Sequence, residues 1–149
     1  MTNMVMANKI MRKDPLQIAL RYLKFRPRSV FEVEQKLKQK GVIKSEIEKV
    51  ISVLKKNNLL DDEEFAKMWV RDRNLLKPTG TYVLKMELRK LGIADGIIEE
   101  VLMAQTDEPL ARKALEMKYR ERNTDYHKKA AFLQRRGFST SLIYKILKT

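Results

Sequence analysis

Three glycines, each set in the same pattern of apolar residues, constrain the fold of this chain more than any other feature of the sequence. Apolar residues stand four positions before and one, six, nine and ten positions after Gly41, Gly92 and Gly137. Glycine readily adopts the left-handed conformation that ends a helix, and apolar residues at the later spacing lie on one face of a following helix. The sequence therefore predicts three copies of a unit made of a helix, a tight turn and a second helix.

Residues that favour the start of a helix occur at matching positions in each unit. Ser29, Gly80 and Asp125 stand twelve positions before the three glycines, and these residue types are favoured where a helix begins. Ser29 is also followed by Glu32 at the spacing of a capping box. A leading helix is predicted in each unit as well, because an acidic residue or a proline marks a further start. These starts are placed at Asp14 and Pro15, at Asp61 and Asp62, and near Asp107 and Pro109.

The predicted fold is all-α, with nine helices in three tandem three-helix repeats that are similar to helix-turn-helix units. No stretch alternates apolar and polar residues over the length of a strand. Repeats of this size bury little surface alone, so we expect them to stack in an elongated, curved array. The predicted divisions are a mobile N-terminal segment over residues 1–13 and repeats over residues 14–60, 61–106 and 107–149.

The composition favours a protein with an acidic partner. The chain has 149 residues and a formal net charge of +13, and nucleic acid is the most common partner of such a basic chain. The absence of cysteine excludes disulfides and thiolate metal sites. No apolar run approaches the roughly 20 residues of a membrane span, and residues 1–13 lack the features of a secretory signal. We therefore expect a cytoplasmic protein that does not contact membranes.

The positive charge is concentrated at the two ends of the chain. Residues 1–60 carry a net charge of +9, residues 61–108 carry −4 and residues 109–149 carry +8. A partner with both protein and phosphate surfaces fits this alternation better than bare DNA does. The candidate contact residues are the clustered cations of the first and third repeats, although basic side chains on solvated helix faces would look the same. They are Arg21, Lys24, Arg26, Arg28, Lys36, Lys40, Arg120, Arg122, Lys128, Lys129, Arg135 and Arg136.

Other function classes have less support. An operator-binding protein would insert the last helix of a unit into DNA, but in the first two units that helix begins with acidic residues. The acidic run that starts at Asp61 is better explained by helix capping than by metal binding. His127 has no second His and no Cys to share a metal with, and Trp69 is interpreted as a core anchor. Since no catalytic or phosphate-binding motif is present either, we predict no enzyme, no cofactor and no metal site.

Four segments, in a fixed order along the chain, carry a family resemblance. They are Arg28-Ser29 with Glu32 and Lys36-Leu37; Leu59-Leu60-Asp61-Asp62-Glu63-Glu64-Phe65-Ala66 with Val70 and Arg73; Gly80 with Glu87-Leu88-Arg89-Lys90-Leu91-Gly92-Ile93; and Arg135-Arg136-Gly137-Phe138-Ser139. With these segments the chain resembles the RecX family, the regulators of the RecA recombinase, over residues 16–147. Asn58 and Val33 depart from the usual glycine and leucine. Both departures are mild, because asparagine also adopts the left-handed turn conformation and valine keeps the face apolar.

The resemblance implies three tandem three-helix repeats and a regulatory function. It implies a protein that binds the RecA filament on single-stranded DNA, lodges in its helical groove and inhibits ATP hydrolysis, filament extension and strand exchange. The expected partners are therefore RecA and single-stranded DNA, with double-stranded DNA as an additional candidate, and the chain is expected to act as a monomer. A helical nucleic-acid-binding module that acts only by occupying DNA is the alternative.

Overall fold

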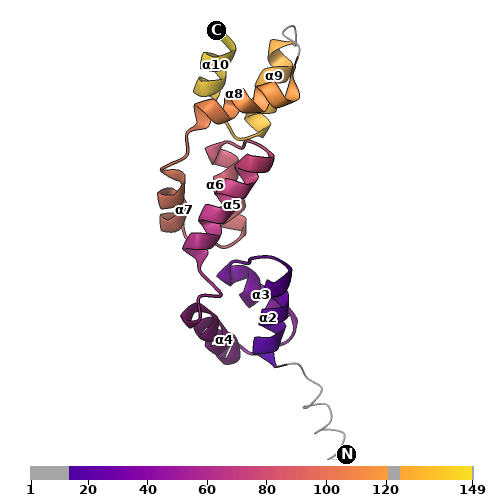
Figure 1. Cartoon of the computed structure of the whole chain (residues 1–149), viewed down its shortest axis with the longest axis vertical. Helices are drawn as coiled ribbons and strands as arrows, with labels where there is room; N and C mark the ends of the chain where they lie inside the picture. The colour runs from indigo at the N-terminus through magenta and orange to yellow at the C-terminus, as the bar shows by residue number, and fades with distance from the viewer. Residues whose placement is uncertain (1–13, 121–124, 149) are drawn as a thin grey trace, which may run out of the picture. The chain divides into compact units, whose positions relative to one another are not determined.

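The computed structural model describes residues 14–120 and 125–148, so the predicted mobile segment over residues 1–13 lies outside the described part. The described residues form nine α-helices and no strand, which confirms the all-α fold (Figure 1). The helices are α2 (Pro15–Phe25), α3 (Val30–Gln39), α4 (Lys44–Lys56), α5 (Asp62–Leu76), α6 (Thr81–Lys90), α7 (Asp95–Leu102), α8 (Asp107–Lys118), α9 (Tyr126–Arg135) and α10 (Thr140–Lys148).

The chain divides into two compact units, residues 1–62 and residues 63–149. In the first unit, α2, α3 and α4 surround a hydrophobic core in which Val33, Leu37 and Leu54 are fully buried. Each helix contributes apolar residues at helical spacing, so that one face of each is buried against the other two. The buried residues of this core are Ala19, Val33, Leu37, Ile47, Val50, Ile51, Leu54 and Leu60.

The second unit contains two hydrophobic clusters. One joins α5, α6 and α7 through residues such as Leu84 and Ile98, and the other joins α8, α9 and α10 around Leu133. Trp69 is half-buried against the first cluster, with its ring centroid 5.9 Å from that of Phe65, as expected of a core anchor. These clusters lie within the predicted second and third repeats, whose boundaries stay predictions.

The three glycine turns have the conformation that the spacing predicts. Gly41, Gly92 and Gly137 have φ values of 81°, 77° and 93°. After the first of them, the Val42 N–H donates to the carbonyl oxygen of Leu37 at 3.0 Å, and the other two turns contain the same bond. This bond closes a Schellman motif, in which the residue four before the glycine also packs against the residue one after it. The repeated apolar pair around each glycine is therefore the signature of this helix end.

Three of the predicted helix starts are formed by side-chain caps. Asp14 accepts a hydrogen bond from the Leu16 N–H at 3.3 Å, and Asp125 accepts one from the His127 N–H at 3.1 Å. Ser29 forms the predicted capping box, since its hydroxyl accepts from the Glu32 N–H and the Glu32 carboxylate accepts from the Ser29 N–H. The caps fix where α2, α3 and α9 begin.

Two acidic residues cap helices other than their own. Asp62 is the first residue of α5, but its carboxylate accepts a hydrogen bond at 2.9 Å from the Val30 N–H, at the start of α3. Asp107 is the first residue of α8, and its carboxylate accepts from the N–H and the hydroxyl of Thr81, at the start of α6. In both cases the first residue of a helix caps a helix that comes earlier in the chain.

Burial raises the pKa of the Asp62 carboxyl and is the largest influence on it. The hydrogen bond from the Val30 N–H and the positive charge of Lys55 partly offset this effect.

Replacing Asp62 with alanine is expected to lower the free energy of unfolding by about 1–2 kcal/mol, because it leaves the Val30 N–H without its acceptor. Asp62→Asn keeps an oxygen acceptor and removes the charge that burial opposes, so it should stay close to the wild type. Urea denaturation followed by circular dichroism at pH 7 measures both, and equal stability of all three proteins would contradict the capping role.

Candidate functional site

A groove of about 1310 Å³ lies on the first unit, along α2 and the turn between α3 and α4. Four of the six cations predicted as contact residues in the first repeat line it, and two acidic residues, Asp14 and Glu46, line it as well. We call this feature the cationic groove. Its lining residues are Asp14, Pro15, Ile18, Arg21, Tyr22, Phe25, Arg28, Lys36, Lys40, Gly41, Val42, Ile43 and Glu46.

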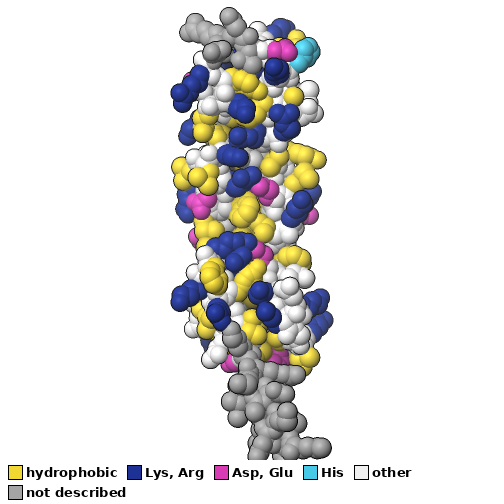
Figure 2. Space-filling view, turned by 90° about the vertical axis from the view of Figure 1, so that its right-hand side faces the viewer, with side chains coloured by type: hydrophobic (Ala, Val, Ile, Leu, Met, Phe, Trp, Pro, Cys, Tyr) yellow, Lys and Arg dark blue, Asp and Glu magenta, His cyan; other side chains and the backbone are white. Residues whose placement is uncertain are grey.

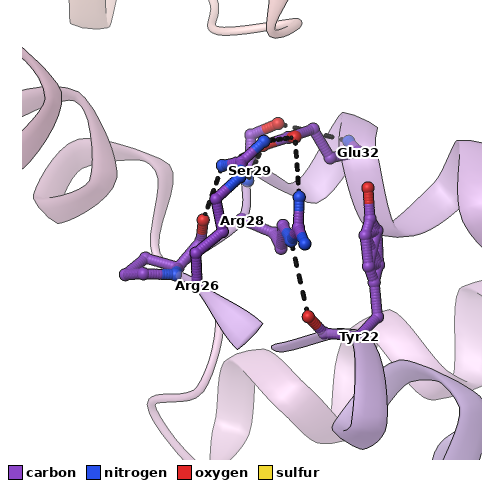
Figure 3. Close-up of polar contacts among 6 residues, drawn as sticks. Tyr22, Arg26, Arg28, Ser29 and Glu32 are labelled. Carbon is purple, nitrogen blue, oxygen red and sulfur yellow. Dashed lines mark hydrogen bonds and ion pairs between the residues drawn. The ribbon is translucent and has the colours of Figure 1, made fainter. Parts of the chain in front are cut away.

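Two of these cations lie over the ring of Tyr22. The Arg28 guanidinium is 3.9 Å from the ring centroid and the Lys36 Nζ is 5.3 Å from it. Arg28 also donates from Nε to the Tyr22 carbonyl oxygen at 3.4 Å and lies 3.8 Å from the Glu32 carboxylate (Figure 3). These contacts hold the guanidinium over the aromatic ring, and both residues line the groove.

The remaining two predicted cations of the first repeat do not line the groove. Arg26 donates to both carboxylate oxygens of Glu32 and, at 2.8 Å, to the Pro27 carbonyl oxygen (Figure 3). It therefore closes the turn between α2 and α3. Lys24 is exposed in the last turn of α2.

The groove combines positive charge with exposed apolar surface. Phe25 is 77% exposed and Ile43 is 63% exposed, although side chains of this size are usually buried. Cations beside accessible aromatic rings suit single-stranded nucleic acid, whose phosphates pair with the charges and whose bases stack on the rings. Figure 2 shows Lys and Arg side chains next to hydrophobic ones on the viewed face.

Tyr22 and Phe25 were not among the residues predicted from the sequence. A signal for them exists, because basic and aromatic residues alternate closely between residue 21 and residue 28. The positions of the charged residues alone do not reveal this alternation of basic and aromatic residues.

The predicted cations of the third repeat have different surroundings. Arg120 is exposed just after α8, and Lys128 and Arg135 are exposed seven residues apart on α9, which places them on one face. Lys129 is half-buried near the start of α9. Arg122 lies outside the described residues.

Arg136 has contacts that support the fold. Its guanidinium donates to the Pro78 carbonyl oxygen at 3.0 Å and lies 5.0 Å from the centroid of the Phe132 ring. Burial, with a contribution from nearby Arg73, lowers the pKa of the guanidinium. The side chain therefore joins α9 to the loop before α6, and a contact with a partner would be a second role.

The acidic and aromatic residues singled out by sequence also have structural partners. Glu63 and Glu64 each lie 3.6 Å from Lys67, and these two carboxylates raise the pKa of its ammonium group. The exposed His127 ring packs edge-on against Tyr126. Within residues 14–120 and 125–148, no cluster of three His, Cys, Asp or Glu side chains could hold a metal ion, and no helix is long and apolar enough to span a membrane.

Comparison with known proteins places the chain in a family. The family description "RecX, first three-helix domain" matches residues 16–54, and "RecX, second three-helix domain" matches residues 61–102. A regulatory protein RecX of Thermotoga maritima is 38% identical over 135 residues, which cover 91% of this chain and 83% of the relative. The chain belongs to the RecX family.

Two further relatives show how much of a RecX protein the chain matches. A regulatory protein RecX of Prosthecochloris aestuarii is 43% identical over 90 residues, which are 60% of this chain and 60% of that relative. The chain spans 51% of a RecX from a Geobacillus strain.

The crystal structure of RecX from Lactobacillus salivarius matches with a TM-score of 0.73 at 29% identity, covering 90% of this chain and 92% of that one. The RecX family member described here therefore shares its helical fold with a solved RecX.

Proposed function

We propose that this RecX family member binds the RecA filament assembled on single-stranded DNA and inhibits ATP hydrolysis, filament extension and strand exchange. In this role it acts in the cytoplasm as a monomer, without catalysis or cofactor, and modulates recombination and DNA repair. The observation that carries the DNA-facing part of this proposal is the cationic groove. Its four cations, the Tyr22 ring and the exposed Phe25 suit the phosphates and unstacked bases of an extended single strand.

The distribution of charge supports a partner made of protein and DNA. Residues 61–108, which contain the second repeat, carry a net charge of −4, and phosphate would repel them. A protein surface of opposite sign accommodates an acidic segment and steers its approach. The basic first and third repeats then approach phosphate, while the second repeat contacts protein.

The alternative is a nucleic-acid-binding module that affects recombination only by occupying DNA. The cationic groove favours it as well, because the groove alone does not require a protein partner. The two functions differ in which substrate is preferred and in how the affinity responds to salt.

A salt titration distinguishes these functions. For naked single-stranded DNA, four groove cations that each neutralise a phosphate predict a slope of log K against log salt of roughly −3. A filament regulator should bind RecA filaments more tightly than naked DNA and with a shallower slope, since part of its contact is with protein. Fluorescence anisotropy with labelled oligonucleotide, bare or coated with RecA, measures both. Tighter binding to naked DNA at every salt concentration would favour the alternative.

A further inference from the structure

In the second unit, the turn that ends α9 is docked on the amino terminus of α6. The carbonyl oxygen of Arg136 accepts a hydrogen bond from the Gly80 N–H at 2.7 Å, and that of Gly137 accepts one from the Tyr82 N–H at 3.3 Å. The first N–H groups of a helix have no partner inside the helix. The docked turn therefore satisfies these donors with the carbonyl groups of its own backbone.

This contact requires residues that have no β-carbon. A β-carbon on Gly80 would lie 2.3 Å from the carbonyl carbon and oxygen of Gly137, and one on Gly137 would lie 2.6 Å from the Val83 nitrogen. Gly137 is accordingly buried. A helix that docks in this way has to begin at a glycine.

The turn that ends α3 has the same backbone but is open. Gly41 has φ of 81°, close to the 93° of Gly137, and the hydrogen bond that closes the turn is alike in both. However, Gly41 is exposed, and a β-carbon built on it would meet no atom within 4 Å. The first unit thus presents an undocked copy of a turn that is docked in the second unit.

Ile43, two residues after Gly41, breaks a local rule of helix formation. It is the N-cap residue of α4, makes no capping hydrogen bond and is 63% exposed. Ser, Thr, Asp and Asn are preferred at this position because their side chains satisfy a free N–H of the helix. An exposed apolar residue beside an open turn, at a position where a polar residue would cap the helix, is typical of a binding surface.

We propose that the Gly41 turn, together with Ile43, is a docking surface for the amino terminus of an α-helix in a protein partner. Under the proposed function, on which this inference rests, that partner is a RecA protomer in the filament. The partner helix begins at a glycine, and its first N–H groups donate to the carbonyl oxygens of Lys40 and Gly41, as in the contact between α9 and α6. The partial positive charge of that helix end meets the partial negative charge at the end of α3, and Ile43 adds apolar contact.

A second copy of this chain is a poorer occupant. The amino terminus of α9 corresponds in the repeat to that of α6, but its N-cap residue is Asp125. Asp125 has a β-carbon at the position where Gly80 has none, and its carboxylate already accepts the His127 N–H at 3.1 Å. A partner helix that begins at glycine avoids both obstacles.

The test is Ile43→Ser, a substitution that leaves the net charge unchanged. Its binding to RecA filaments and to naked single-stranded DNA is measured. Serine removes the apolar contact and supplies the missing cap of α4, so the variant should fold at least as well as the wild type. We expect its affinity for filaments to fall at least about tenfold, as for a residue at the centre of an interface, and its affinity for naked DNA to fall by a smaller factor, because Ile43 lines the cationic groove but offers neither a charge nor an aromatic ring. Ala94→Ser makes the equivalent change at the uncapped start of α7 and should leave both affinities unchanged.

Four outcomes would overturn the inference. If Ile43→Ser binds filaments as tightly as the wild type, the inference is overturned while the proposed function stands. Equal losses of affinity for filaments and for naked DNA would assign Ile43 to the nucleic-acid site instead. A wild-type dimer in sedimentation that Ile43→Ser dissociates would identify a second copy as the occupant. Wild-type protein that does not bind filaments would overturn the proposed function and this inference with it.

Discussion

Replacing Gly137 with alanine is expected to lower the free energy of unfolding of the second unit by about 3 kcal/mol or more. Two effects add in this variant. The left-handed φ of 93° costs a residue with a β-carbon about 1–2 kcal/mol, and the new carbon would lie 2.6 Å from the backbone nitrogen of Val83. Because backbone atoms cannot move aside as a flexible side chain can, the contact between α9 and α6 has to separate.

Gly41→Ala is the matched control for this prediction. It carries the same conformational strain at φ of 81° but meets no atom within 4 Å, so it should cost only about 1–2 kcal/mol. Denaturant unfolding followed by circular dichroism, with the unit assigned by tryptophan fluorescence from Trp69, measures both variants. Equal losses of stability would show that the docked turn contributes nothing beyond its own conformation.

Reversing Arg21 and Lys36 to glutamate is expected to raise the concentration needed for half-inhibition of RecA by about 100-fold. That effect corresponds to about 1.4 kcal/mol for each reversed charge, because each reversal removes an attraction to phosphate and adds a repulsion. Both residues line the cationic groove, and Lys36 lies over the Tyr22 ring. The readout is inhibition of DNA-dependent ATP hydrolysis by RecA, titrated with each variant.

Matched reversals in the other two repeats make this prediction specific. Lys77→Glu with Lys90→Glu changes two exposed residues of the acidic second repeat and should have little effect on inhibition. Lys128→Glu with Arg135→Glu should weaken inhibition strongly, because residues 109–149 carry a net charge of +8. Arg136 is left unchanged, since its bond to Pro78 supports the fold. Equal effects of all three pairs would contradict the proposed importance of the first and third repeats.

The features that could be predicted from the sequence are those that depend on neighbours along the chain. A Schellman turn joins residues within six positions, so the glycine with its apolar pair fixes the end of each second helix. The capping box of Ser29 and Glu32 and the cap at Asp125 are equally local. Asn58 also adopts the left-handed conformation, with φ of 59°, as expected of asparagine in place of glycine.

The features that could not be predicted depend on contacts between distant parts of the chain. Nothing in the residues around Asp62 shows that its carboxylate caps α3, 32 positions earlier, because only the folded chain brings them together. Arg135 and Arg136 look identical in the sequence, yet one is exposed and the other is bound to the Pro78 carbonyl oxygen. A cation therefore becomes a stronger site candidate only once its existing partners are known.

The central claim is that this RecX family member regulates the RecA filament through contacts with both protein and DNA. It is tested most directly by single-stranded-DNA-dependent ATP hydrolysis by RecA of the same organism, titrated with the protein at fixed salt. We expect inhibition well below one molecule per RecA protomer, because a regulator bound in a filament affects more than the protomer it contacts. Inhibition only when the DNA is coated, or none while DNA is still bound, would contradict the claim.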